Sequence, residues 1–112
     1  MQAISCLLLR DGKWTETEAR LLVPGDIVKV KVGDRVPADL RMVQMISVSL
    51  KIEEAPLTGE SVSVEKIVKP MEGEAPMLQD QRNMLFSSTV VTYGAAIGVV
   101  VFTGMKTAIG RV

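Results

Sequence analysis

Hydrophobic and polar residues alternate along most of the chain, and short turn motifs separate the alternating stretches. A period of two is typical of β-strands with one buried face. About nine short strands at close spacing, without a convincing long helix, favour a mainly β domain of the sandwich, jelly-roll or small-barrel class. The expected strands include residues 5–10, 13–19, 40–45, 50–52 and 62–64.

Two dipeptides predict specific turns. Asp11-Gly12 separates residues 5–10 from residues 13–19 and is a strong signal for a tight hairpin, because glycine tolerates positive φ. Pro24-Gly25 has the residues that a type II turn prefers at its centre. We therefore expect each dipeptide to reverse the chain between neighbouring strands.

Two further stretches predict how strands are buried and paired. Val28, Val30 and Val32 recur with a period of two and are expected to share one face of a strand. Residues 84–94 and 95–103 are expected to pair with each other as the final two strands. The second of these is apolar on both faces, which predicts a central position in its sheet.

Other segments predict connections. Residues 69–83 are polar and contain prolines, so we interpret them as an exposed loop. Residues 106–112 could begin a helix. The chain starts and stops abruptly, which suggests that it is a fragment of a larger protein.

Composition limits the classes of function. The 112 residues suit a single domain, and the 47% hydrophobic and 4% aromatic content predicts an aliphatic core to which strand methionines such as Met42, Met45, Met84 and Met105 contribute. The formal net charge of zero argues against nucleic-acid binding, which needs a basic face. The longest apolar run, residues 94–102, is too short to span a bilayer, so the chain itself is expected to be soluble.

The residue types exclude several catalytic sites. With no histidine and only Cys6, the chain lacks the ligands of a zinc site, a Ser-His-Asp triad and a Cys-His pair. Cys6 lies beside three leucines and is interpreted as an unreactive thiol. Asp26, Asp34 and Asp39 lie in turn contexts and are expected to accept backbone N–H bonds rather than to bind a metal.

The remaining candidate site is Thr58-Gly59-Glu60-Ser61. Gly59 allows a sharp bend that projects Glu60 outward, and the hydroxyls of Thr58 and Ser61 could brace the loop backbone or phosphate oxygens. A positioned carboxylate can hold a water molecule and accept its proton during attack on an electrophile. The electrophile must come from another domain. On pattern alone, an ordinary solvated turn is the alternative interpretation.

Four blocks, in order along the chain, resemble a known family. They are LVPGDIVKVKVGDRVPADLRMV (22–43), LTGESVSVEK (57–66), DQRNMLFSST (80–89) and VVFTGMKTAIGRV (100–112). Together they resemble the actuator domain of a P-type cation-transporting ATPase. The resemblance implies a single domain over residues 1–112 with a distorted jelly-roll, double-stranded β-helix-like fold. It also implies a cytosolic position between membrane helices 2 and 3 of an integral membrane pump.

The resemblance assigns roles to the candidate residues. Glu60 would position and deprotonate the water that attacks an aspartyl phosphate on a separate domain. Thr58 and Gly59 would set the loop against the phosphate, with Ser61 supporting it, and Lys51 would lie near bound nucleotide. No cofactor is expected in this chain, because ATP and Mg²⁺ would bind other domains. The partners would be the phosphorylation and nucleotide-binding domains and the membrane helices of the same polypeptide, and the isolated domain would be inactive.

The transported ion is less defined. Residues 57–66 and the long loop after them resemble calcium pumps of the sarco/endoplasmic-reticulum type, whereas residues 9–28 resemble proton pumps. Calcium is favoured, with a proton or a sodium/potassium pump as the alternative. A non-catalytic β-domain that binds a protein partner through residues 69–83, and a stand-alone hydrolase, are the hypotheses from other classes.

Overall fold

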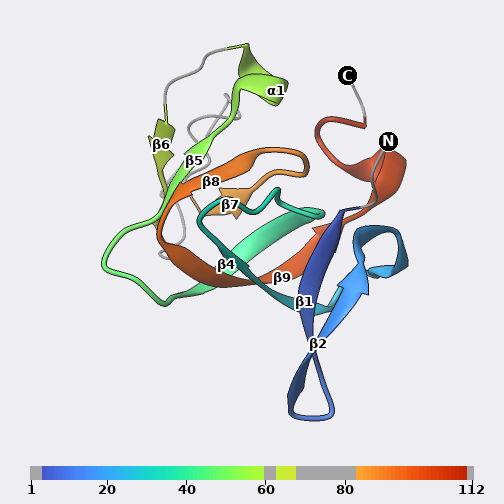
Figure 1. Cartoon of the computed structure of the whole chain (residues 1–112). Helices are drawn as coiled ribbons and strands as arrows, with labels where there is room; N and C mark the ends of the chain where they lie inside the picture. The colour runs from blue at the N-terminus through green and yellow to red at the C-terminus, as the bar shows by residue number, and fades with distance from the viewer. Residues whose placement is uncertain (1–3, 60–62, 68–82, 111–112) are drawn as a thin grey trace.

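The computed structural model describes residues 4–59, 63–67 and 83–110, and it is built from two antiparallel sheets (Figure 1). The larger sheet has six strands in the order β2-β1-β3-β9-β4-β7, and the smaller has the order β6-β5-β8. A mainly β fold with little helix is therefore confirmed. The strands are β1 (Ser5–Arg10), β2 (Lys13–Glu18), β3 (Ile27–Lys31), β4 (Asp39–Met45), β5 (Lys51–Glu53), β6 (Ser63–Glu65), β7 (Met84–Leu85), β8 (Val90–Tyr93) and β9 (Ala95–Phe102). The helices are η1 (Ala19–Leu21), α1 (Ala55–Thr58) and η3 (Gly104–Lys106).

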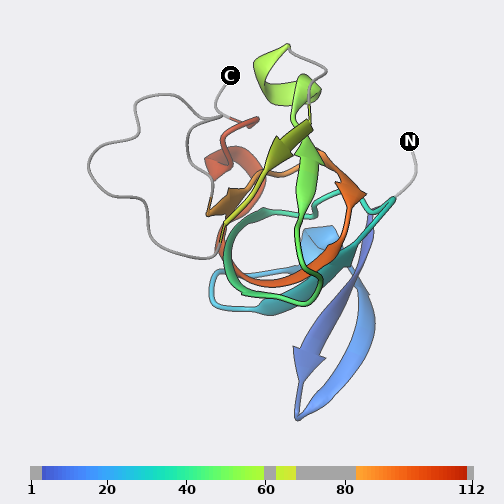
Figure 2. The ribbon, with the colours of Figure 1, turned by 90° about the vertical axis from the view of Figure 1, so that its left-hand side faces the viewer.

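The hairpin of β1 and β2 forms as the sequence predicts. Arg10 pairs with Lys13, and the two residues between them have positive φ, 52° for Asp11 and 75° for Gly12. This is the geometry of a type I′ turn, which matches the twist of the flanking strands. The hairpin projects from one end of the molecule, and α1 lies at the opposite end in both views (Figures 1 and 2).

The turn before β3 also follows the prediction, but the strand is shorter than expected. Gly25 has a φ of 99°, and the N–H of Asp26 donates to the carbonyl of Val23 over 3.1 Å. Val28 and Val30 are buried, whereas Val32 is 58% exposed because it lies beyond the end of β3. The prediction that Val32 shares their buried face is wrong.

The predicted pairing of residues 84–94 with 95–103 is wrong. This stretch divides into β7, which pairs with β4, and β8, which pairs with β5 in the other sheet. A turn that contains Ser88, at a φ of 74°, separates the two strands, and Gly94, at a φ of 89°, carries the chain from the smaller sheet into β9. The central position of β9 is confirmed, since it lies between β3 and β4.

Gly94 is a position where a methyl group has no room. A Cβ there would overlap the carbonyl oxygen of Ser49 and lie 2.5 Å from Oγ of Ser47. We expect Gly94→Ala to lower the free energy of unfolding by at least about 2 kcal/mol, from left-handed strain and overpacking together. Urea denaturation followed by far-ultraviolet circular dichroism measures this loss. Gly25→Ala is the control, because Gly25 has positive φ but no atom within 4 Å of the place that a methyl group would occupy; equal losses in both variants would contradict the steric argument.

The core is aliphatic, as the composition predicts, and methionines contribute to it unequally. Met42 is buried in β4, Met45 is partly buried against the core, and Met84 is partly buried in β7. Met105 is 79% exposed, so the prediction that it fills the core is wrong. It lies in η3, which leaves the sheet after β9.

The segment after β9 does not continue as a long helix, and a buried aspartate binds its backbone. Only the three residues Gly104–Lys106 are helical, so a helix starting at residue 106 is not observed over the described residues 107–110. Asp39 is buried, and its carboxylate accepts the N–H of Ala108 at 2.7 Å and that of Ser87 at 2.9 Å. Asp39 therefore joins the start of β4 to two later segments.

The other two aspartates behave as their turn context predicts. Asp26 accepts the N–H of Val23 at 2.9 Å, and Asp34 accepts that of Lys31 at 3.0 Å. Each bond closes a turn at one end of β3. No helix in the described part of the chain is both long enough and apolar enough to cross a membrane.

Candidate functional site

The candidate loop is carried by the smaller sheet. β5 leads into α1, and the chain returns through β6, which pairs with β5 in antiparallel register. Thr58 is the last residue of α1 and Gly59 follows it. Glu60 and Ser61 lie outside the described residues, as do Val62 and most of the predicted loop over residues 69–83.

A single helical turn precedes the loop, and the sequence explains where it starts and stops. Pro56 lies in the first turn of α1, where its missing N–H leaves no bond unmade. The N–H of Thr58 donates to the carbonyl of Glu54, and that of Gly59 donates to the carbonyl of Ala55, both at 2.9 Å. Gly59 then ends the turn in the left-handed region at a φ of 81°. The bend predicted at Gly59 is confirmed, whereas the helical turn before it was not predicted.

The hydroxyl of Thr58 braces the backbone. Its Oγ1 donates to the carbonyl of Glu54 over 3.2 Å, in addition to the main-chain bond between the same two residues. This bond braces the turn just before the loop, and the expected role of Thr58 in setting the loop against a phosphate stays a prediction. The residue that receives both bonds, Glu54, is the N-cap of α1.

Beneath this turn lies a buried ion pair. Nζ of Lys66 donates to Oε2 of Glu54 over 2.8 Å, and the two side chains are 0% and 1% exposed. The ammonium also lies 5.4 Å from the centre of the Phe86 ring, within the range of a cation–π interaction. The second carboxylate oxygen, Oε1 of Glu54, is buried and has no hydrogen-bond partner among the described residues.

This pair was not predicted, although the sequence contains a signal for it. Val64 and Lys66 are two residues apart, so they face the same side of the chain. Val64 lies opposite the buried Ile52, and the N–H of Lys66 donates to the carbonyl of Leu50 at 2.9 Å. A lysine on the inward side of a strand almost always has a partner of opposite charge, and Glu54 is one of several acidic residues near enough in sequence to supply one.

Lys51 lies at the other end of β5 from α1. It is exposed, lies opposite Glu65 and Tyr93 in the neighbouring strands, and its Nζ is 6.0 Å from the centre of the Tyr93 ring. Tyr93 is itself 56% exposed. Lys51 therefore lies on the strand that leads to the loop, but at its far end, away from Thr58 and Gly59.

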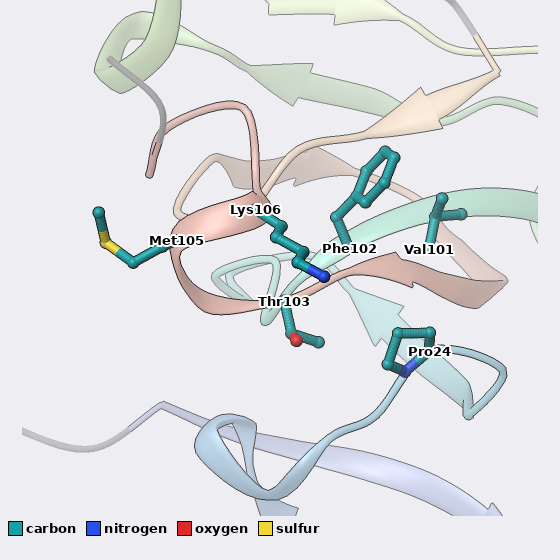
Figure 3. A pocket seen from close by; sticks show the side chains of 6 residues that line it. All are labelled: Pro24, Val101, Phe102, Thr103, Met105 and Lys106. Atoms are coloured by element: carbon teal, nitrogen blue, oxygen red, sulfur yellow. The ribbon is translucent and has the colours of Figure 1, made fainter.

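A pocket elsewhere on the surface contains none of the predicted site residues. It lies between the end of β9, η3 and the turn before β3, and has a volume of about 480 Å³ (Figure 3). Its lining offers one hydroxyl and one ammonium but no carboxylate of the kind expected at residue 60. Its residues are Pro24, Val101, Phe102, Thr103, Met105 and Lys106.

The described residues contain no group of three or more His, Cys, Asp or Glu side chains that could hold a metal ion. Cys6 is buried in β1. Desolvation, and secondarily the negative charges of Asp26 and Asp34, raise the pKa of its thiol above 9.0. A buried, protonated thiol is a poor nucleophile, which agrees with the interpretation of Cys6 as unreactive.

Cys6 gives a prediction about pH. Because the folded state holds the thiol proton more tightly than the unfolded state, the contribution of Cys6 to stability is complete below pH 9.0 and is lost as the pH rises toward the folded pKa.

The burial of Cys6 also predicts its reactivity. We expect alkylation by iodoacetamide at pH 8 to be much slower in the native chain than in urea, measured by mass spectrometry. Equal rates in the two states would contradict the burial of this thiol.

Comparison with known proteins gives one family. The family described as "P-type ATPase actuator domain" matches residues 1–112. The chain is 49% identical over 105 residues to the endoplasmic reticulum calcium ATPase srcA of Aspergillus fumigatus, covering 94% of this chain and 11% of that protein. It is 48% identical over 106 residues to a calcium-transporting ATPase of Bacillus subtilis, covering 95% and 12% respectively. For a calcium-transporting ATPase of Plasmodium falciparum the identity is 43% over 114 residues, covering 100% and 9%.

Solved structures agree with the fold. Two crystal structures of a zinc-transporting PIB-type ATPase, in different states of the pump, are similar to this chain. The first has a TM-score of 0.71 at 25% identity and covers 96% of this chain and 15% of that one. The second has a TM-score of 0.74 at 24% identity, covering 99% and 16%. The chain spans only 9% to 12% of the length of the curated relatives named above.

Proposed function

Because the chain belongs to the P-type ATPase actuator domain family, we propose that it is the actuator domain of a calcium-transporting ATPase and drives hydrolysis of that pump's aspartyl-phosphate intermediate. The observation that carries this proposal is the match over residues 1–112, together with relatives of 43% to 49% identity that are named as calcium pumps.

In the proposed reaction, Glu60 is the general base. It holds a water molecule in line with the phosphorus and takes one proton as the water oxygen attacks. The new P–O bond forms while the bond from phosphorus to the aspartate oxygen breaks, which releases inorganic phosphate and returns the aspartate to its carboxylate form. A carboxylate suits this role because it both orients water and accepts its proton.

The neighbouring residues position that carboxylate. Gly59 turns the chain at a φ of 81°, which a side chain would strain, and Thr58 is fixed to Glu54 by two hydrogen bonds. Both features support a loop that presents the next residue in one direction. In the proposal, Thr58 and Gly59 set the loop against the phosphate, and Ser61 supports it.

The rest of the machinery belongs to the parent pump. We place the phosphorylated aspartate, ATP and Mg²⁺ on its phosphorylation and nucleotide-binding domains, and this domain in the cytosol between membrane helices 2 and 3. Lys51 is proposed to contact nucleotide when the domains meet. Its exposed ammonium lies beside the exposed ring of Tyr93, which offers a charge for phosphate and a face for a base.

Calcium is proposed rather than protons or sodium and potassium, because the relatives cited above are named as calcium pumps. The test uses membrane vesicles that contain the full-length pump. We expect phosphoenzyme formation from radiolabelled ATP to require calcium and to disappear with a calcium chelator in the presence of Mg²⁺. A variant without the phosphorylated aspartate gives the background. Phosphorylation that persists under chelation would contradict the proposal for calcium.

A further inference from the structure

We propose that the buried ion pair of Glu54 and Lys66 is a positioning device for the 58–61 loop, so that its loss slows phosphoenzyme hydrolysis even where the fold is retained. This inference rests on the proposed function of the loop. The two residues flank the loop in sequence, and their side chains meet at 2.8 Å in the interior. Neither residue is expected to touch the substrate.

The register of the smaller sheet shows what the pair joins. The ladder between β5 and β6 ends on the loop side at Glu53 opposite Ser63, and Glu54 is the first residue beyond it. Lys66 lies at the far end of the same ladder, bonded through its N–H to the carbonyl of Leu50. Leu50 and Glu54 are separated by about 13 Å of strand length. The long side chain of Lys66 therefore extends along the buried side of β5 and β6 and reaches Glu54 at the base of the loop.

Glu54 transmits this restraint to the loop. Its side chain is fixed by Lys66, while its carbonyl accepts both the N–H and the Oγ1 of Thr58. A movement of Glu54 would thus move Thr58, which is two residues before Glu60. Glu54 is therefore fixed by the ammonium of Lys66 through its side chain, and it fixes Thr58 by two hydrogen bonds through its carbonyl.

Lys66 is in turn held by the core. The ring of Phe86 lies 5.4 Å from its Nζ, and Phe86 is buried. The carbonyl of Phe86 accepts the hydroxyl of Thr89 at 2.6 Å, which fixes the turn between β7 and β8. This turn also contains Ser87, whose N–H is bound by Asp39 at the start of β4. Through these contacts, the base of the loop is fixed in position relative to the larger sheet.

Stability alone does not explain a charged pair at this place. Moving two charges out of water is so unfavourable that apolar side chains of similar volume are often as stabilising or more so. The pair is also imperfect, because Oε1 of Glu54 is buried without a hydrogen-bond partner among the described residues. What a charged hydrogen bond provides, and apolar packing does not, is a fixed direction and a short fixed distance.

The decisive variant removes both charges at once. Glu54→Met with Lys66→Met keeps most of the buried volume and leaves neither charge without a partner. In the intact pump we expect phosphoenzyme formation from ATP at the parent level and a decay of the phosphoenzyme about 10- to 100-fold slower, the range for a small misplacement of a catalytic group.

Two controls separate positioning from loss of stability and from failure of the proposed function. Val28→Ala opens a cavity in the buried part of β3, away from the loop, and should leave the decay rate unchanged. Glu60→Gln tests the function itself. If Glu60→Gln decays at the parent rate, the proposed function fails. If Glu60→Gln decays slowly while the double methionine variant decays at the parent rate, only the positioning role is overturned.

Failure of the double variant to form phosphoenzyme does not end the test. Glu54→Asp retains the charge but shortens the side chain by one methylene, so the base of the loop must shift to keep the bond to Lys66. Slower decay with a normal level of phosphoenzyme supports the inference. Decay at the parent rate overturns it, since a pair that only supplied charge would tolerate the shorter acid.

Discussion

Replacement of Glu60 by Gln in the intact pump should leave formation of the phosphoenzyme from ATP unchanged and slow its hydrolysis about 100-fold or more, the usual contribution of a general base. Glutamine keeps the shape of the side chain and can still accept a hydrogen bond from water. It cannot take the proton that the attacking water must lose. The measurement is the decay of radiolabelled phosphoenzyme after a chase with excess unlabelled ATP and a calcium chelator.

Glu65→Gln is the matched control for this experiment. Glu65 is an exposed glutamate on β6, opposite Lys51 in the same sheet, and it has no proposed role in the reaction. It should decay at the parent rate. Decay of the Glu60→Gln phosphoenzyme at that same rate would contradict the assignment of Glu60 as the base.

Replacement of Glu54 by Ala should lower the free energy of unfolding of the 112-residue chain by about 3–5 kcal/mol, because it leaves the fully buried ammonium of Lys66 without its carboxylate. The effect is large because the charge has no route to water, with 0% of the Lys66 side chain exposed. Urea denaturation followed by far-ultraviolet circular dichroism gives the value. Addition of Lys66→Met should restore much of the loss.

The control for Glu54→Ala is an ion pair at the surface. Glu18 and Arg20 are bonded at 2.8 Å, but their side chains are 41% and 73% exposed. Water screens such a pair, so Glu18→Ala should change the stability by no more than about 1 kcal/mol. Similar small losses in the two variants would show that the buried pair has little influence on folding.

Local signals in the sequence were sufficient for the fold class and for several turns. Asp11-Gly12 and Pro24-Gly25 set backbone angles through their own covalent structure, so their turns do not depend on distant residues. The alternation through Val28 and Val30 identified the buried face of β3 for a similar reason. Val32 continued the pattern but lay past the end of the strand, and the end of a strand depends on where its neighbours stop.

The pairing of β8 and β9 could not be obtained in this way. Two apolar stretches separated by Gly94 have the same local pattern whether they pair with each other or enter different sheets. The outcome depends on contacts with β5 and β4, which are distant in sequence. The close approach of Gly94 to Ser49 is likewise a tertiary contact that no periodicity contains.

At the candidate site, the bend at Gly59 was predicted from the sequence, but the buried ion pair of Glu54 and Lys66 was not. Gly59 has the positive φ that the turn chemistry predicts. The buried pair was missed because the contact between Glu54 and Lys66 is tertiary, and no local pattern shows where β5 ends. In the structure β5 ends at Glu53, and Glu54 caps α1 with its side chain turned inward to Lys66.

The proposed function requires the 58–61 loop to carry a carboxylate to a phosphoryl group on another domain. The most direct test is a structure of the full-length pump, trapped with a fluoride complex that mimics the phosphoryl group during hydrolysis. We expect the Glu60 carboxylate at about 3 Å from the water oxygen in line with that group, the reach of a general base. A Glu60 side chain turned into its own domain, with the phosphoryl mimic contacted by other residues, would contradict it.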